Sequence, residues 1–260
     1  MIPWLESLST TVAGIVIVGG FVVIALLIGY LVSRFTSREV RMAHNDRAGF
    51  ILAVIGVVYA VLLAFVAIGV WERFQEAETR TYEEASAIST VYRDAGSFPG
   101  AVKLRAMLRA YVNSIIYDEW PQMKEGERSP ISNALLEAAD RDVRALPADT
   151  IRLGGIQTQM LGAMDTALMD RQTRLTIDSS GINHLMWFVL IAGAFITVAF
   201  TYLFGFDQTL MQELMIGGLS LLIGLVLFLV IALDYPFRGS IYVQPEAFRA
   251  LIETFSAIGG

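Results

Sequence analysis

The sequence has 260 residues, of which 55% are hydrophobic and only 17% charged, and it carries a net charge of −6 and no cysteine. Because an ordinary soluble domain has roughly 45–50% apolar and about 25% charged residues, this composition predicts a lipid-facing surface. The acidic balance argues against nucleic acid as a partner, and the lack of cysteine excludes disulfides, thiolate catalysis and cysteine-bound metals.

Four long stretches contain no Asp, Glu, Lys, Arg or His: residues 11–32, 48–71, 185–206 and 214–233. Each is long enough to cross about 30 Å of hydrocarbon at about 1.5 Å per helical residue. We expect the first to remain as a membrane helix rather than a cleaved signal peptide, because residues 1–10 hold no Lys or Arg and no small-x-small site follows. The sequence therefore predicts an all-α integral membrane protein with four transmembrane helices.

The four spans pair into two hairpins, because the connecting residues 33–47 and 207–213 are too short to fold by themselves. These two loops must lie on one face of the membrane, while both termini and the segment after the second span lie on the other. The chain therefore divides into a first hairpin, an inserted helical domain, a second hairpin and a C-terminal tail, at residues 1–71, 72–182, 183–234 and 235–260.

The arginines close to the membrane predict an orientation. The first loop concentrates Arg34, Arg38, Arg41 and Arg47, whereas the arginines of the other face are spread over much more chain. Positively charged short loops favour the cytoplasmic side. We therefore expect the loops to be cytoplasmic, and the helical domain and both termini to be extracytoplasmic, in a multi-pass protein of the plasma (inner) membrane.

The second span is expected to continue as a helix beyond the membrane. No Gly or Pro occurs between Trp71 and Ala95. Within this segment a stripe with the spacing of an amphipathic helix is formed by Phe74, Ala77, Thr81, Ala85, Ile88 and Tyr92. One helix is predicted from about Asp46 to Asp94, roughly 75 Å long.

Three further helices are predicted to complete the inserted domain. One covers about residues 100–117, with Pro121 as its stop. The next begins with Ser129 as N-cap and Pro130 as first helical residue. Asp149 is expected to cap the last. No alternating strand pattern occurs, so the domain is predicted to be a helical bundle.

The sequence lacks the residue combinations that catalysis or metal binding requires. Its two histidines, His44 and His184, fall at opposite membrane faces in the predicted topology, which excludes a histidine-pair metal centre. Walker and dinucleotide glycine motifs are missing. Most carboxylates of the inserted domain share a helix with arginine at helical spacing, such as Glu76 with Arg80, as on a solvated face. We therefore expect no enzymatic activity and no metal or other cofactor.

Two flanks of the second span are candidate functional surfaces. One carries small residues every fourth position, Gly56, Ala60 and Ala64, and the other carries bulky Val58, Leu62 and Phe65. Small residues allow helices to pack closely in lipid. Alternatively, the span lines a pore that the bulky residues narrow as a dewetting gate. The sequence leaves helix packing and pore lining both open.

A polar cluster marks the loop end of the second span. His44, Asn45 and Asp46 precede the helix, and Asp207 and Gln208 of the second loop are expected on the same membrane face. Asn45 or Asp46 would cap the helix and complement its positive end. An ion site between the two loops is the alternative interpretation.

Several segments together resemble the bacterial bestrophin-like domain family of membrane proteins: residues 44–50 (HNDRAGF), 56–65 (GVVYAVLLAF), 71–72, 84–85, 91–95, 234–239 and 244–246. The resemblance covers nearly the whole chain. It implies kinship with bestrophins, which are pentameric anion channels with four membrane helices, the second of which lines the pore. Bestrophins keep their large domain and termini in the cytoplasm, opposite to the orientation that the arginines predict.

Two functional hypotheses follow. The first is an oligomeric membrane ion channel for anions, with the second span lining the pore and with lipid, inorganic ions and further copies of the chain as partners. The second is a non-conducting membrane scaffold or sensor, whose helical domain binds an envelope partner or transmits a signal along the long helix. A closed ring with a solvated axis would favour the channel, and a monomer or dry dimer would favour the scaffold.

Overall fold

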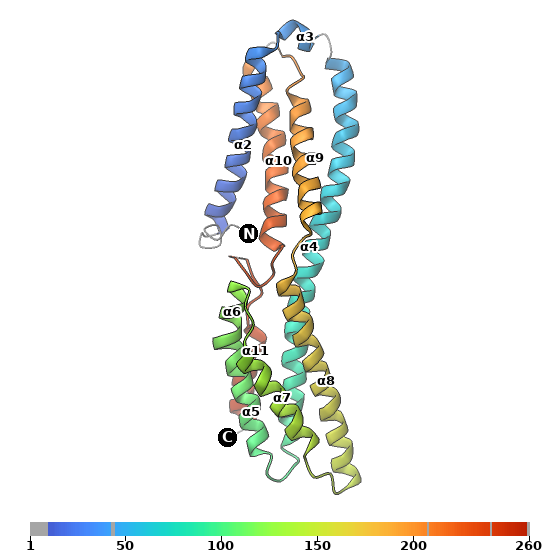
Figure 1. The fold of residues 1–260 in the computed structure, drawn as a ribbon, viewed down its shortest axis with the longest axis vertical. Coiled ribbons are helices and arrows are strands. Elements are labelled where there is room, and N and C mark those ends of the chain that lie inside the picture. The colour runs from blue at the N-terminus through green and yellow to red at the C-terminus, as the bar shows by residue number, and fades with distance from the viewer. Residues whose placement is uncertain (1–9, 43–44, 207, 240, 259–260) are drawn as a thin grey trace. The chain divides into compact units, whose positions relative to one another are not determined.

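The computed structural model describes residues 10–42, 45–206, 208–239 and 241–258 (Figure 1). These residues form helices and connecting loops, and none of the residues that the structure describes belongs to a strand. The chain forms two compact units: Met1–Glu72 with Ile182–Asp234, and Arg73–Gly181 with Tyr235–Gly260. The helix α4, Asn45–Ala95, contributes to both units.

The first unit contains the four helices that are long and apolar enough to cross a membrane: α2 (Thr10–Phe35), α4, α9 (His184–Thr201) and α10 (Thr209–Leu233). A short helix, α3 (Arg38–Met42), lies in the first loop. Only between 17% and 28% of the residues in the apolar windows are buried within the chain. Such an apolar exterior requires lipid or other protein around it. The prediction of an all-α protein with four membrane helices is thus confirmed.

Small residues allow close helix packing in this unit. The α2 and α10 helices lie side by side, with Gly29 of α2 against Ile216 and the Tyr202 ring. A Cβ on Gly29 would lie 2.9 Å from Cδ1 of Ile216, so a larger residue here would require the Ile216 side chain to move. The Tyr202 hydroxyl donates a hydrogen bond to the Ala25 carbonyl oxygen at 2.9 Å, which ties the end of α9 to α2.

The second unit is a helical bundle around one apolar core. Its helices, besides the second part of α4, are α5 (Val102–Ser114), the π-helix η1 (Ile115–Glu119), α6 (Trp120–Glu125), α7 (Pro130–Arg144), α8 (Ile151–Ser179) and α11 (Glu246–Ile258). The core draws residues from α4, α5, η1, α6, α7, α8 and α11, with Leu108, Leu136 and Phe248 among its fully buried members. The observed bounds of α4 lie within one residue of the predicted ones.

Two details of this bundle differ from the sequence-based expectation. Pro121 does not stop the helix: α5 passes through η1 directly into α6, where the proline occupies the first turn. A π-helix changes the hydrogen-bond register, and a first-turn position needs no backbone N–H donor, so proline is accommodated. Thr150 rather than Asp149 caps α8, its side chain accepting from the Leu153 amide at 3.2 Å.

The predicted start of α7 is confirmed. Ser129 is its N-cap, and the Ser129 hydroxyl oxygen accepts a hydrogen bond from the Ser132 amide at 3.2 Å. Pro130 follows as the first helical residue. The hydroxyl thus satisfies one of the amide groups that a helix start leaves without a partner.

The C-terminal segment is an integral part of the second unit. The sequence pattern predicts only a C-terminal tail here and does not indicate α11. Phe248 and Phe255 of α11 are buried, and the Phe255 ring stacks on Tyr92 with centroids 3.8 Å apart. The Trp120 indole N–H donates to the Val243 carbonyl oxygen at 3.0 Å. These contacts anchor the C-terminal segment to α4 and α6.

Candidate functional site

The membrane part of α4 has one buried stripe, formed by Tyr59, Leu63, Val66 and Val70. These residues recur every three or four positions, as expected for one face of a helix. The Tyr59 hydroxyl donates a hydrogen bond to the Leu190 carbonyl oxygen of α9 at 3.1 Å. The Tyr59 ring lies against Gly193, which has no side chain to hold α9 away. Because α4 has only this narrow buried stripe, most of its circumference stays open.

The small-residue flank of α4 faces a groove within the first unit. Gly56, Ala60 and Ala64 line a groove of about 380 Å³ together with residues of α9 and α10: Thr197, Leu219, Leu222, Ile223 and Val226. The Thr197 hydroxyl donates to the Gly193 carbonyl oxygen of its own helix at 2.7 Å. The groove surface is therefore almost entirely apolar.

The bulky flank of α4 lies on the other side of the buried stripe. Val58 is 66% exposed, Phe65 is 71% exposed, and Leu62 is partly exposed. At about 100° per helical residue, this flank and the small-residue flank are separated by the Tyr59–Val70 stripe. Within the part of the chain that the structure describes, the bulky flank remains largely uncovered.

The loop end of α4 is only partly described, because His44 and Asp207 lie outside the described residues. Asn45 connects this end to the loop before α10: its amide nitrogen donates to the Gly205 carbonyl oxygen at 2.9 Å, and its side-chain oxygen accepts from the Gly205 amide at 3.0 Å. Asp46 and Gln208 are exposed, and Gln208 forms no side-chain cap for α10. Asn45 therefore joins the two loops.

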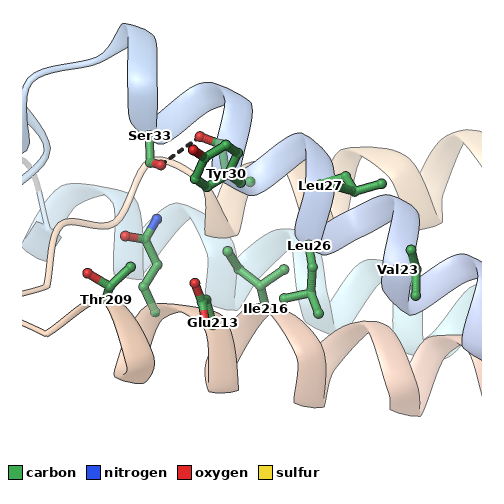
Figure 2. Close-up of a pocket in the computed structure, with 10 residues that line it drawn as sticks. Val23, Leu26, Leu27, Tyr30, Ser33, Thr209, Glu213 and Ile216 are labelled. Atoms are coloured by element: carbon green, nitrogen blue, oxygen red, sulfur yellow. Dashed lines mark hydrogen bonds between the residues drawn. The ribbon is translucent and has the colours of Figure 1, made fainter.

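A second polar feature at this end was not predicted. Arg41 of α3 is 8% exposed, and its Nη1 donates to the side-chain oxygen of Gln212 in α10 at 3.3 Å. Figure 2 shows the neighbouring groove between α2 and α10, with polar Ser33, Thr209 and Glu213 toward its loop end. The sequence signalled only that Arg41 belongs to an arginine-rich loop.

The second unit contains a buried network of charged groups. The Arg174 guanidinium of α8 donates from Nε to Glu84 Oε2 at 2.8 Å and from Nη2 to Glu119 Oε1 at 2.7 Å. Arg171 donates to the second Glu119 oxygen and, at 2.9 Å, to Asn133 of α7. Two carboxylates and two guanidiniums thus neutralise each other in the core and connect α4, η1, α7 and α8.

An aromatic hydroxyl and an aromatic ring complete this network. The Tyr111 hydroxyl donates to Glu84, and burial, reinforced by the Glu84 carboxylate, raises the pKa of Tyr111 well above its ordinary value. The hydroxyl therefore stays protonated and serves as a donor. The Arg174 guanidinium lies over the Trp120 ring, 4.7 Å from its centroid. Because every charged member is shielded from solvent, this arrangement fits cross-linking of helices better than chemistry on a substrate.

A signal for this network was present in the sequence. The buried stripe of α8 runs through Met160, Met164 and Ala167 and then continues at Arg171 and Arg174 with the same spacing. The spacing of carboxylates and arginines predicts a solvated face for most charges of this domain. That holds for Glu76 and Arg80, which are partly exposed and 3.7 Å apart. The prediction of a solvated face was wrong for the charged residues that continue an apolar stripe, such as Arg171 and Arg174.

The described residues offer no evident metal centre, since no group of three or more His, Cys, Asp or Glu side chains is placed to hold an ion among them.

The four apolar helices and their exposed apolar faces define a four-span integral membrane protein. Its sequence matches the family model of the Bestrophin-like domain over residues 19–248. The chain therefore belongs to the Bestrophin-like family, as its sequence segments predicted.

Solved structures share this fold. A crystal structure of a bacterial bestrophin homologue from Klebsiella pneumoniae that carries a point mutation has 13% identity and a TM-score of 0.66, and the match covers 92% of this chain and 99% of that chain. Another, solved by Zn-SAD phasing, has 14% identity and a TM-score of 0.62 over 91% and 96%. A variant described only as a membrane protein has 12% identity and a TM-score of 0.70 over 92% and 97%. No match was found among curated proteins.

Proposed function

We propose that this protein is one subunit of an oligomeric membrane channel that conducts small inorganic anions, with α4 lining the pore. Membership of the Bestrophin-like family supports this proposal, as does the fold shared with bacterial bestrophin homologues. The observation that carries the pore assignment is the uncovered bulky flank of α4, where Val58 and Phe65 are exposed. No catalytic role is proposed for any residue.

The two flanks of α4 suit different tasks. Gly56, Ala60 and Ala64 already line a groove with α9 and α10, so we assign them to helix packing. Val58, Leu62 and Phe65 lack such partners within the described chain and would face the axis of the assembly. An apolar constriction of this kind gates by dewetting, since water and ions leave a narrow apolar tube. Because the four spans carry no charged residue, the ion selectivity of the pore would come from residues at the helix ends and at the rim of the pore.

Recordings from planar bilayers that contain the purified protein test the channel directly. We expect chloride-dependent currents, and electron microscopy should reveal a closed ring with a solvated axis; five copies would match the bestrophin analogy. Absence of current together with an assembly that lacks a central opening would refute the proposal. Empty bilayers and heat-inactivated protein are the necessary controls.

A second function, a non-conducting scaffold or sensor, is favoured by one specific observation. The single 51-residue helix α4 passes from the membrane spans into the second unit, where Glu84 belongs to the buried charged network. Such a helix would connect an event in one unit with the other. A monomer or dry dimer in the membrane, without conductance, would support this function instead of the channel.

We also propose an orientation of the chain in the membrane. The arginine count assigns the α2–α4 and α9–α10 loops to the cytoplasm of a bacterial cell and the second unit to the extracytoplasmic side of the inner membrane. Kinship with bestrophins implies the reverse. Because the chain contains no cysteine, single introduced cysteines can decide between the two orientations.

A further inference from the structure

Arg41 is a buried cation without a carboxylate partner among the described residues. The only hydrogen-bond partner of its Nη1 among the described residues is the side-chain oxygen of Gln212. Gln212 itself is 7% exposed. Its Nε is buried and has no hydrogen-bond partner. An amide oxygen does not neutralise a guanidinium, and a buried charge needs a counter-charge to be tolerated. The Arg41 guanidinium is therefore left without a counter-charge among the described residues.

A groove lies beside this cation. It has a volume of about 320 Å³ and is lined by Thr36, Arg41, Arg47, Ala48, Ile51, Phe200 and Leu203. Arg47 is exposed and forms no ion pair with a described residue. Arg47 and Ala48 also belong to the first turn of α4, where the helix dipole favours negative charge. The two arginines thus bring positive charge to the border of a groove whose exposed lining is almost entirely apolar.

The rest of the groove is apolar. Ile51 follows Arg47 by about one helical turn toward the membrane interior, and Phe200 and Leu203 come from the end of α9. A small soluble anion would contact the arginines and gain nothing from these side chains. A phospholipid would use both parts, with phosphate on the arginines and an acyl chain along the apolar wall. Basic pockets between membrane helices bind anionic headgroups in this way.

We propose that this groove is a binding site for an anionic phospholipid, held through its phosphate by Arg41 and Arg47. The planar guanidinium of arginine matches phosphate oxygens with paired hydrogen bonds. The site lies where α4 begins and α9 ends, at the boundary of two apolar spans. The proposal concerns lipid recognition alone, so it does not depend on whether the assembly conducts ions.

Native mass spectrometry of the purified protein, released from detergent, tests this site. The protein is titrated with phosphatidylglycerol and with phosphatidylcholine of the same acyl chains, and the retained lipid is counted. We expect phosphatidylglycerol to bind more tightly, and Arg41→Gln to weaken it roughly tenfold, as the loss of charged hydrogen bonds predicts. Arg34→Gln is the matched control, because Arg34 is an exposed arginine in the last turn of α2 that does not line the groove.

Leu203→Glu provides a second variant, which keeps both arginines and places a negative charge on the apolar wall. We expect it to reduce phosphatidylglycerol retention even if Arg41→Gln fails to fold. Equal retention of the two lipids, or an equal loss in Arg34→Gln, would overturn the proposal. Competition by glycerol phosphate at concentrations similar to those of the lipid would also overturn it, because it would indicate a site for a small anion only.

Discussion

Gly193 of α9 lies directly beneath the ring of Tyr59 in α4, so that a Cβ added to Gly193 would lie 2.5 Å from Cδ2 of that ring. Only glycine lets the two helices approach closely enough for the Tyr59 hydroxyl to reach the Leu190 carbonyl oxygen at 3.1 Å. The stripe that fixes the rotation of α4, and with it the direction of the bulky flank, depends on this contact.

Gly193→Ala should therefore destabilise the first unit. We expect a loss of about 1–3 kcal/mol in the free energy of unfolding, the usual range for overpacking in a close-packed interior. Thermal unfolding of the protein in detergent measures the effect. Gly69→Ala is the matched control, because no atom lies within 4 Å of a Cβ placed there. Equal behaviour of the two variants would contradict the role assigned to Gly193.

Arg174 supplies a second prediction, for the buried charged network. Arg174→Met leaves Glu84 without its guanidinium partner, and breaking a buried pair in this way costs about 3–5 kcal/mol. Chemical or thermal denaturation should detect this as a large loss of stability. Arg144→Met is the control: Arg144 is exposed, and its contact with Asp140 at 2.9 Å lies at the surface, so little change is expected. If Arg174→Met and Arg144→Met lose the same amount of stability, the buried Arg174 contacts do not stabilise the fold.

The buried Asp178 carboxyl group predicts that the stability of the folded protein depends on pH. Burial raises the pKa of Asp178 above its ordinary value, and Arg238, whose Nε lies 3.3 Å from the Asp178 carboxylate, opposes this. A carboxyl group with a raised folded-state pKa contributes stability that is complete below the unfolded pKa of about 3.9 and is lost as pH rises through the folded value. The parent protein should therefore lose stability relative to Asp178→Asn as pH rises from about 4 toward neutrality.

Unfolding midpoints across this pH range, measured for both proteins in the same detergent, give the comparison. Asp165→Asn serves as control, because the Asp165 side chain is 70% exposed. A difference between parent and Asp178→Asn that stays constant with pH would contradict the prediction.

The bulky flank predicts a change in conductance. If Val58, Leu62 and Phe65 narrow the pore, Leu62→Ala and Phe65→Ala should widen and wet it, and single-channel current should rise severalfold. Ile24→Ala shortens an apolar side chain of α2 that is 58% exposed and has no assigned role in the pore. Bilayer recordings should separate the two groups of variants. An unchanged current in both α4 variants would remove these residues from the pore.

Single cysteines test the orientation. Ser37→Cys lies in the first loop and Glu127→Cys in an exposed turn of the second unit. With the orientation that the arginines predict, a membrane-impermeant maleimide added to intact spheroplasts should label Glu127→Cys and spare Ser37→Cys. Labelling of the opposite set would place the second unit in the cytoplasm, as kinship with bestrophins implies.

The membrane helices could be predicted because their cause is local. An uncharged stretch of about 20 residues is stable in lipid only as a helix, whatever surrounds it. The long α4 and the start of α7 were also predictable, since helix breakers and caps act within a few residues. Family membership followed in the same way from segments that can be read along the chain.

Burial of charge, in contrast, was decided only by the tertiary structure. Glu84 and Arg174 are separated by 90 positions and lie on stripes that would otherwise be apolar. Whether such a charge is tolerated depends on the counter-charge that another helix brings, and no local pattern contains that information. The same holds for α11, which the core of the second unit fixes in place, and for Arg41, whose burial depends on the position of α10. The sequence by itself determined which segments enter the membrane. The packing of the helices determined which polar groups are buried and which partners they have there.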